Sequence, residues 1–232
     1  MKKMKIIKRP AKKTVGEHIF TLIKAAISEI PIPGAGAGAV LLEEYIGSST
    51  KNAINKALKF LKDKLNLYGE RIDISQSDPD EISDITKQYY QIILNNSHEL
   101  KLKSASSILA NAYLKADDSS KLTYVELDHM LKCINSLSIG SLEILGVIYS
   151  KIVPKSQRHH TNKNYRFNFE DLKRYFPQHE STFLMGLVGE CNSLNLLHIS
   201  GIPQIPTNEY GNYPIELTKF GQRFIKHMID DI

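Results

Sequence analysis

The chain has 232 residues, of which 42% are hydrophobic and 24% are charged, proportions that are ordinary for a globular protein with a sizeable buried core. Only two cysteines occur, Cys133 and Cys191, which excludes a disulfide-based scaffold and fits a reducing cytosol. The net charge of +5 is a property of the N-terminus, because residues 1–13 carry seven Lys and Arg and no acid.

We interpret residues 1–13 as a flexible basic arm. Such an arm suits an anionic lipid surface or a nucleic acid, and a solvated tail that aids solubility is the plainer alternative. The apolar run behind it is interrupted by Lys24 and Glu29, which argues against a signal peptide. We therefore expect a cytoplasmic protein that can be peripheral to the inner membrane. The cations of the basic arm are Lys2, Lys3, Lys5, Lys8, Arg9, Lys12 and Lys13.

The most apolar stretch of the chain, Ile19 to Ile46, follows this arm. Polar residues recur every three to four positions in its first half, which predicts an amphipathic helix that ends before Pro31. A second helix is expected to begin within the glycine run from Gly34 to Gly38, so that the two form a helical hairpin. The candidate membrane or self-association residues of the hairpin are Ile19, Phe20, Ile23, Ile27, Ile30, Val40, Leu41 and Leu42.

This hairpin is too short and too interrupted for a permanent membrane span. A spanning helix needs about 20 predominantly apolar residues. The longest uncharged window here runs from Ile30 to Leu42 and contains two prolines and three glycines. Two interpretations remain: a pair of core helices in a helical domain, or a hairpin that is buried at rest and inserts on activation or oligomerisation.

Thr50 to Tyr68 has the pattern of a basic amphipathic helix, with Ile54, Leu58 and Leu61 on one side and lysines around the rest. Packing of this leucine stripe against the hairpin is the expected arrangement, and contact with an anionic membrane surface is the alternative. Together these segments predict a three-helix N-terminal unit covering residues 14–70.

A second, central segment covers residues 71–136. Gly69 to Asp80 is polar and predicts a linker, with Asp78 as the cap of the next helix and Pro79 in its first turn. Apolar periodicity then predicts helices over 81–95, 101–115 and 122–136. The small residues at 104–107 should let helices approach one another closely.

The pattern changes in residues 137–232. Helices are expected over 141–152, 168–175 and 181–194, and a basic polar loop from Lys155 to Arg166 follows the first of them. Strands are expected at 196–200 and at Ile215 to Leu217, before a closing helix over 218–229. This order is that of a winged helix. The expected fold is thus mainly α: an N-terminal helical hairpin and helical bundle, with a C-terminal winged-helix-like α+β module.

Several short stretches resemble the bacterial abortive-infection alpha family. They are Pro31-Ile32-Pro33-Gly34, Ser107-Ile108-Leu109-Ala110-Asn111-Ala112, Ser136-Leu137-Ser138, and Leu217-Thr218-Lys219-Phe220-Gly221-Gln222-Arg223-Phe224, which looks like the closing LTxxGxxF of that family. The resemblance implies a role in phage defence, in which an infected cell is arrested or killed. It carries no catalytic residues to transfer.

The sequence argues against specific recognition of duplex DNA. Such recognition uses Lys and Arg on the recognition helix and nearby elements, yet none occurs between Tyr175 and Thr218. Phe183, Leu184, Met185, Leu187 and Val188 instead make the candidate recognition helix look like core or a protein interface. Contact with an anion or a nucleic acid, if present, is predicted to use Lys155, Arg158, Lys163, Arg166, Lys173 and Arg174.

No motif in the chain indicates an enzyme. The histidines and cysteines lack the spacing of a metal site, and the glycine run lacks the lysine of a phosphate-binding loop. We expect no cofactor, metal or catalytic residue. The leading hypothesis is a non-enzymatic defence protein that associates with itself, another protein or an anionic membrane; the alternatives are a nucleic-acid-associated regulator and a structural adaptor in a larger complex.

Overall fold

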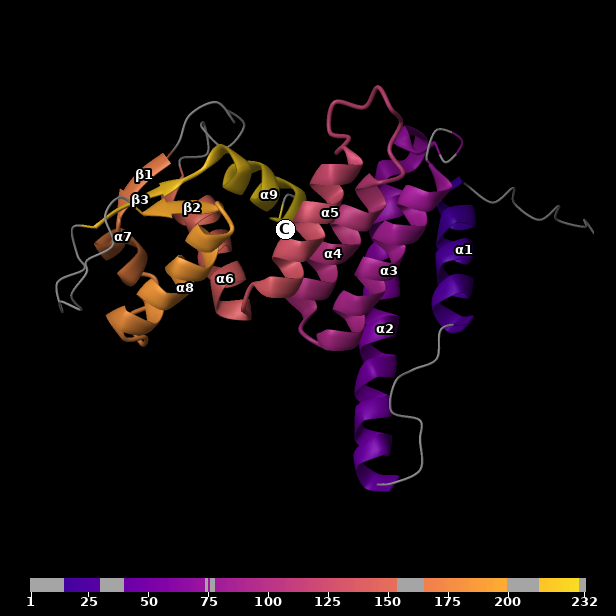
Figure 1. The fold of residues 1–232 in the computed structure, drawn as a ribbon, viewed down its shortest axis with the longest axis horizontal. Helices are drawn as coiled ribbons and strands as arrows, with labels where there is room; N and C mark the ends of the chain where they lie inside the picture. The colour runs from indigo at the N-terminus through magenta and orange to yellow at the C-terminus, as the bar shows by residue number, and fades with distance from the viewer. Residues whose placement is uncertain are drawn as a thin grey trace, which may run out of the picture.

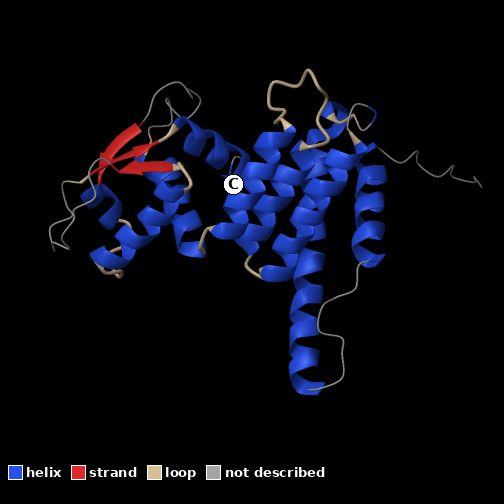
Figure 2. Cartoon of the chain, viewed as in Figure 1, coloured by secondary structure: helices blue, strands red, loops and turns tan. Residues whose placement is uncertain are grey.

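The computed structural model describes residues 15–29, 40–73, 75, 78–153, 165–199 and 213–229; within these ranges, the side chains of residues 28–29 and 40–47 are not described. The chain forms two lobes that lie side by side (Figure 1). One lobe is a helical bundle, and the other combines helices with the small sheet shown in red in Figure 2. The expectation of a mainly α fold with a small α+β region is confirmed.

The bundle lobe consists of α1 (Val15–Glu29), α2 (Val40–Tyr68), the 3-10 turn η1 (Gly69–Arg71), α3 (Pro79–Asn95), α4 (Glu99–Asn111) and α5 (Tyr124–Ser136). The first two helices form the expected hairpin, with α1 at the outer edge of the molecule (Figure 1). The prediction of three helices in this unit is wrong, because α2 runs without a break from Val40 to Tyr68. Gly47 and the two following serines weaken a helix by about 1 kcal/mol or less each, which is less than the cost of an interior proline.

Helix α4 lies at the centre of the bundle. Almost every one of its side chains is buried, including Ser104, Ser106 and Ser107, and its interface with α2 is the most extensive in the molecule. The Ser106 hydroxyl lies 3.0 Å from the Ala57 carbonyl oxygen of α2 and 3.0 Å from the Tyr89 hydroxyl of α3. The small residues therefore allow the close approach that the sequence predicts.

The start of α3 is also as predicted. The Asp78 carboxylate accepts hydrogen bonds from the backbone amides of Asp80, at 2.8 Å, and Glu81, and Pro79 is the first helical residue. The apolar face of this helix, which includes Ile85, Tyr89 and Ile92, is buried. A capping residue, an N-terminal proline and a regular apolar stripe thus agree with one another, and they fix this element from local sequence alone.

The second lobe begins with α6 (Ile139–Val147), which continues as a π-helical turn, η3 (Ile148–Ile152). It then contains β1 (Tyr165–Asn168), α7 (Phe169–Lys173), α8 (Ser181–Ser193), β2 (Leu197–Ile199), β3 (Pro214–Leu217) and α9 (Lys219–Ile229). The sheet is antiparallel, with β3 between β1 and β2. The sequence does not predict strand β1, because Tyr165 and Arg166 fall at the end of the expected basic loop and Asn168 at the start of the expected helix over 168–175.

The register of the sheet shows why β1 forms. Tyr165 and Leu197 both pair with Leu217, and Phe167 and Ile199 both pair with Ile215. All but Tyr165, which packs partly buried against the core, are buried. The inner face of this short strand is therefore completed by residues that are about 50 positions away, and a four-residue alternation is too short to announce it locally. The hydrophobic core runs continuously through both lobes.

Candidate functional site

The predicted association face of α1 lies against α2. Ile19, Ile23 and Ile27 are buried, and α1 packs chiefly on α2 with a smaller contact to η1. Phe20 is partly buried, and the Nζ atom of Lys62 lies 5.7 Å from the centre of its ring. The described part of this face is thus covered by a single partner helix. Ile30 and the side chains of Val40, Leu41 and Leu42 lie outside the described residues, as does the whole basic arm.

A glycine permits the close approach of α1 to α2. A Cβ atom added to Gly16 would lie 3.3 Å from the carbonyl oxygen of Leu65, which is tighter than an ordinary van der Waals contact. The outer side of the same helix keeps apolar groups in solvent, since Val15 and Leu22 are each 49% exposed. Helix α1 therefore has one covered and one partly apolar open side.

The described cations of the predicted anion cluster do not converge. Arg166 of β1 is ion-paired with Glu216 of β3, and the ammonium of Lys173 donates to the carbonyl oxygen of His179. Arg174 lies 3.6 Å from an Asp171 carboxylate oxygen within its own turn. Each cation has its own intramolecular partner. Lys155, Arg158 and Lys163 lie outside the described residues.

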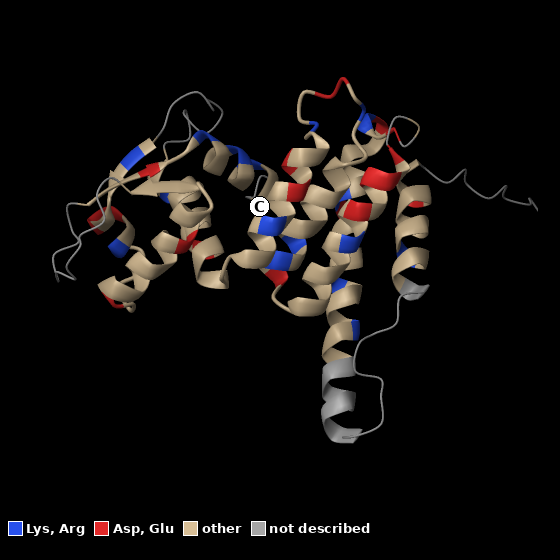
Figure 3. Ribbon diagram, in the orientation of Figure 1, with Lys and Arg blue, Asp and Glu red and all other residues tan. Residues whose placement is uncertain are grey.

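Helix α8 has a buried apolar side and an exposed aromatic one. Leu184, Leu187 and Val188 are in the core, whereas Phe183 is 52% exposed and Met185 is partly buried. The Phe183 ring lies 5.2 Å from that of His179, and Tyr175 nearby in the sequence is 45% exposed. No Lys or Arg lies on α8 (Figure 3). The core role is confirmed for Leu184, Leu187 and Val188, and an interface on the exposed side of α8 stays a prediction.

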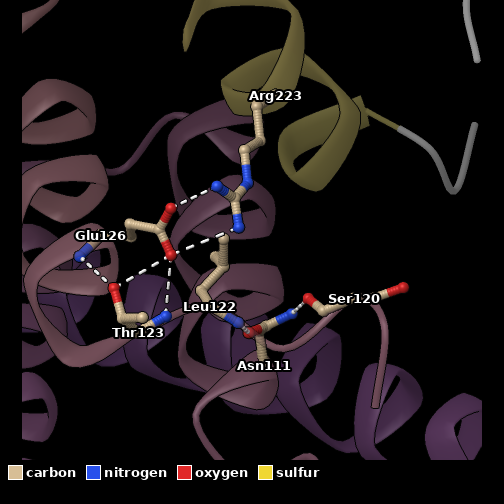
Figure 4. Close-up of polar contacts among 6 residues, drawn as sticks. All are labelled: Asn111, Ser120, Leu122, Thr123, Glu126 and Arg223. Atoms are coloured by element: carbon tan, nitrogen blue, oxygen red, sulfur yellow. Dashed lines mark hydrogen bonds and ion pairs between the residues drawn. The ribbon is translucent and has the colours of Figure 1, made fainter. Parts of the chain in front are cut away.

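The two lobes are joined by a polar contact between α9 and α5 (Figure 4). The guanidinium of Arg223 binds both carboxylate oxygens of Glu126, with a distance of 3.3 Å from Nη2 to Oε2. The same carboxylate accepts hydrogen bonds from the Thr123 amide at 2.9 Å and the Thr123 hydroxyl at 3.0 Å, completing a capping box at the start of α5. One acidic side chain thus both caps a bundle helix and holds the C-terminal helix.

Asn111 fixes the loop that leads to this contact. Its side-chain amide donates to the Ser120 carbonyl oxygen at 2.8 Å, and its oxygen accepts from the Leu122 amide at 2.8 Å (Figure 4). Asn111 is fully buried at the end of α4. It therefore positions Thr123, and through it Glu126. The Thr123-x-x-Glu126 pattern is a capping-box signature that sequence reasoning missed.

Aromatic and cationic groups surround the rest of the contact between α9 and the bundle lobe. The ring of Phe220 lies 5.0 Å from that of His129 on α5, and Phe224 is fully buried. Burial, reinforced by the nearby cations of Arg223, Lys226 and Lys64, lowers the pKa of His227 to about 4. This histidine is therefore neutral at neutral pH. Lys64 belongs to α2, so the end of α9 reaches the same helix that carries α1.

A second polar contact holds α8 against α6. The Glu190 carboxylate accepts from the Ser138 amide at 3.0 Å and from the Ser141 hydroxyl at 2.7 Å. Burial opposes ionisation of Glu190, but these hydrogen bonds outweigh it and lower the pKa of the carboxyl group. The carboxylate is therefore a structural acceptor that holds α8 at the start of α6.

Potential metal ligands and the two thiols are spread apart or buried in the described part of the chain. They contain no group of three or more His, Cys, Asp or Glu residues able to hold a metal ion. Burial raises the pKa of the Cys133 thiol to about 11 and that of Cys191 to about 12, so both cysteines are protonated at neutral pH. Within the described ranges, no single helix has the length and apolar character needed to cross a membrane; α5 together with α6 and η3 meets those criteria only as a pair bent by 114°.

Comparison with protein-family models, curated proteins and solved structures gives no match to this chain. A functional proposal can rest on three features: the apolar face of α1, the exposed side of α8 and the contact of α9 with the bundle lobe.

Proposed function

We propose that the chain is a non-enzymatic bacterial defence protein of the abortive-infection type. In this proposal α1 and α2 engage an anionic membrane or a second copy of the chain, and the C-terminal lobe acts as a winged-helix-like interaction module that controls them. The observation that carries the proposal is that the apolar face of α1 is buried mainly against one helix, at the edge of the molecule.

Helix α1 can separate from α2 at a moderate cost in free energy. Its burial rests on three isoleucines, each of which contributes about 2 kcal/mol when removed from water. Separation of the two helices would leave the hydrogen bonds within each helix intact. A lipid surface or a second apolar helix would bury the same side chains again, so the cost of release is recovered at the new partner.

The C-terminal lobe has the order of elements expected for a winged helix. Helix α6 is followed by β1, α7, α8, β2 and β3, and the central position of β3 in the sheet suits that topology. In such a module α8 would occupy the recognition position. Its exposed Phe183 and its lack of cations favour a protein partner over duplex DNA.

Helix α2 offers a route for control. It carries α1 on one side, packs on α4 on another, and brings Lys64 close to His227 of α9. A partner that moves the C-terminal module would thus act on the helix on which α1 rests. The nucleic-acid alternative is the weaker proposal, because the three described cations of its candidate set already have intramolecular partners.

The proposal is tested by weakening the packing of α1 on α2 without removing any apolar group. Gly16→Leu places a side chain against the Leu65 carbonyl, whereas Gly189→Leu, on the side of α8 away from Phe183, adds the same side chain where a Cβ meets nothing within 4 Å. We expect Gly16→Leu to increase flotation with phosphatidylcholine/phosphatidylglycerol vesicles, or self-association in sedimentation velocity, severalfold over the wild type. Gly189→Leu should resemble the wild type.

Circular dichroism confirms that each variant is folded. If folded Gly16→Leu protein neither floats with vesicles nor self-associates more than the wild type, release of α1 has no effector role and the proposal is wrong. An equal increase in the Gly189→Leu control would assign the effect to added hydrophobicity alone and would also overturn it.

A further inference from the structure

A polar groove lies in the bundle, between α2 and the turn that joins α3 to α4. It consists of two adjoining cavities of about 240 and 300 Å³, which share Ser49, Ala53 and Ser97 as lining residues. Its floor is apolar, since Ala53 and Ile93 are buried. The larger cavity reaches the lower end of the roughly 300–1,000 Å³ range of small-molecule sites. The remaining described lining residues are Ser48, Thr50, Asn52, Lys56, Leu94, Asn95 and Asn96.

The walls of this groove present hydrogen-bond donors and one positive charge. Asn52 and Lys56 lie one turn apart on α2, so their side chains share a face, and Ser97 stands opposite on the turn. No carboxylate is among the described residues that line either cavity. Hydroxyl, amide and ammonium groups without an acid form a set that suits an anion with several oxygens.

Several cations of this fold are paired with acids, but within the described residues Lys56 is not. Arg71, Lys132 and Arg223 are each ion-paired with a carboxylate, whereas Lys56 has no ion-pair partner within the described part of the chain. The side chains of Asn52 and Ser97 likewise have no hydrogen-bond partner among the described residues. Their donors are therefore available in the groove.

The start of α4 adds to the positive potential. Ser97 immediately precedes His98, the N-cap residue, whose side chain makes no capping hydrogen bond. The first amides of a helix have no intrahelical acceptor and carry a partial positive charge. This helix end supports the charge of Lys56 but would not define a site without the cavity and its side chains.

We propose that this groove binds a phosphate group. The Lys56 ammonium would contact the phosphate oxygens, while the hydroxyls of Ser49 and Ser97 and the amide of Asn52 donate to them. The phosphate can belong to a soluble phosphorylated molecule or to a phospholipid head group. Only the lipid source rests on the proposed membrane function, because binding of a soluble phosphate needs the groove alone.

The soluble source is tested by titrating the full chain with glycerol 3-phosphate in isothermal calorimetry. Loss of one charge-assisted hydrogen bond predicts about tenfold weaker binding for Lys56→Gln. Lys59→Gln, which removes another exposed lysine of α2 that does not line the groove, should change affinity by about twofold or less. Asn52→Ala should also weaken binding, and it leaves the net charge unchanged.

The lipid source is tested by flotation of the same variants with phosphatidylcholine vesicles containing phosphatidylglycerol. Lys56-dependent binding of both ligands assigns a head-group site, and Lys56-dependent binding of glycerol phosphate alone assigns a soluble ligand even if the membrane proposal fails. Equal losses for Lys56→Gln and Lys59→Gln would show diffuse charge attraction and overturn the site. Absence of saturable, Lys56-dependent binding to either ligand by folded protein would overturn it as well.

Discussion

The first and last helices of the described chain dock on the same bundle in different ways. Helix α1 presents a stripe of buried isoleucines to α2, while α9 combines a buried apolar side, which includes Phe224 and Ile225, with the Arg223–Glu126 ion pair. Apolar burial is not directional and can be provided by many surfaces. A two-oxygen contact to a carboxylate that already caps α5 can be provided only by this bundle. The difference predicts that α1 exchanges partners more easily than α9.

The backbone contacts of the two helices also differ, although that of α9 lies within its own lobe. At α1, a Cβ on Gly16 would be 3.3 Å from a carbonyl oxygen, a contact that a small shift could relieve. At α9, a Cβ on Gly221 would lie 2.0 Å from the Leu196 carbonyl oxygen, and no small shift relieves such an overlap. That carbonyl also accepts from the Thr218 amide at 3.2 Å, so it is held in place. The start of α9 is therefore held rigidly within its own lobe, whereas the contact of α1 with α2 is adjustable.

The largest predicted effect is a loss of stability when the close packing at the start of α9 is disturbed. Gly221→Ala should lower the free energy of unfolding by more than about 3 kcal/mol, because α9 must move away from Leu196. Gly186→Ala, in an open position on α8, is the matched control and should stabilise the protein by about 0.5–1 kcal/mol. Urea unfolding of both variants measures the difference. A cost below about 1 kcal/mol for Gly221→Ala would show that the packing at the start of α9 is as adjustable as that of α1 on α2.

The next effect concerns the two sides of α1. Ile23→Ala removes a buried side chain and should make opening of α1 easier by about 2–4 kcal/mol, seen as faster hydrogen exchange of its amides. Leu22→Ala changes a half-exposed side chain one residue away. It should change the free energy of α1 opening by less than about 1 kcal/mol. If α1 is a separable element, amides of α4 keep their protection in Ile23→Ala. Equal loss of protection in α1 and α4 would mean that α1 cannot leave without unfolding the bundle.

Much of this architecture follows from local sequence. The 3.6-residue spacing predicted α1, and α3 was further marked by Asp78 and Pro79, because each of these signals lies within one or two helical turns. The continuity of α2 was missed, because the apolar stretch ending at Ile46 and the amphipathic pattern starting at Thr50 read as separate helices, with residues of lower helix propensity between them. Strand β1 was missed because its pairing partners are about 50 residues away.

The candidate sites show the same limit more sharply. The apolar face of α1 could be predicted from periodicity, but that α2 covers this face could not, since burial depends on the folded partner. Arg166, Lys173 and Arg174 looked like one cluster in sequence, and the fold gives each a different partner. The Arg223–Glu126 pair joins residues 97 positions apart, so no local pattern identifies it. The groove beside Lys56 likewise depends on how the α3–α4 turn meets α2.

The smallest predicted effect uses pH to loosen α9 and leave α1 in place. Burial and the cations of Arg223, Lys226 and Lys64, which outweigh the nearby Glu126, lower the pKa of His227 to about 4 from an ordinary 6.5. The unfolded chain therefore gains a proton at this position as pH falls from 6.5 to 4 while the folded chain does not, and stability decreases across that window by up to about 3 kcal/mol. His227→Gln should lose this part of the pH dependence in urea unfolding, whereas the exposed His198→Gln should retain it. Because the groups around His227 belong to α9, α2 and α5, acid should increase hydrogen exchange in α9 before α1; the reverse order would contradict the assignment of α9 as the pH-sensitive seat.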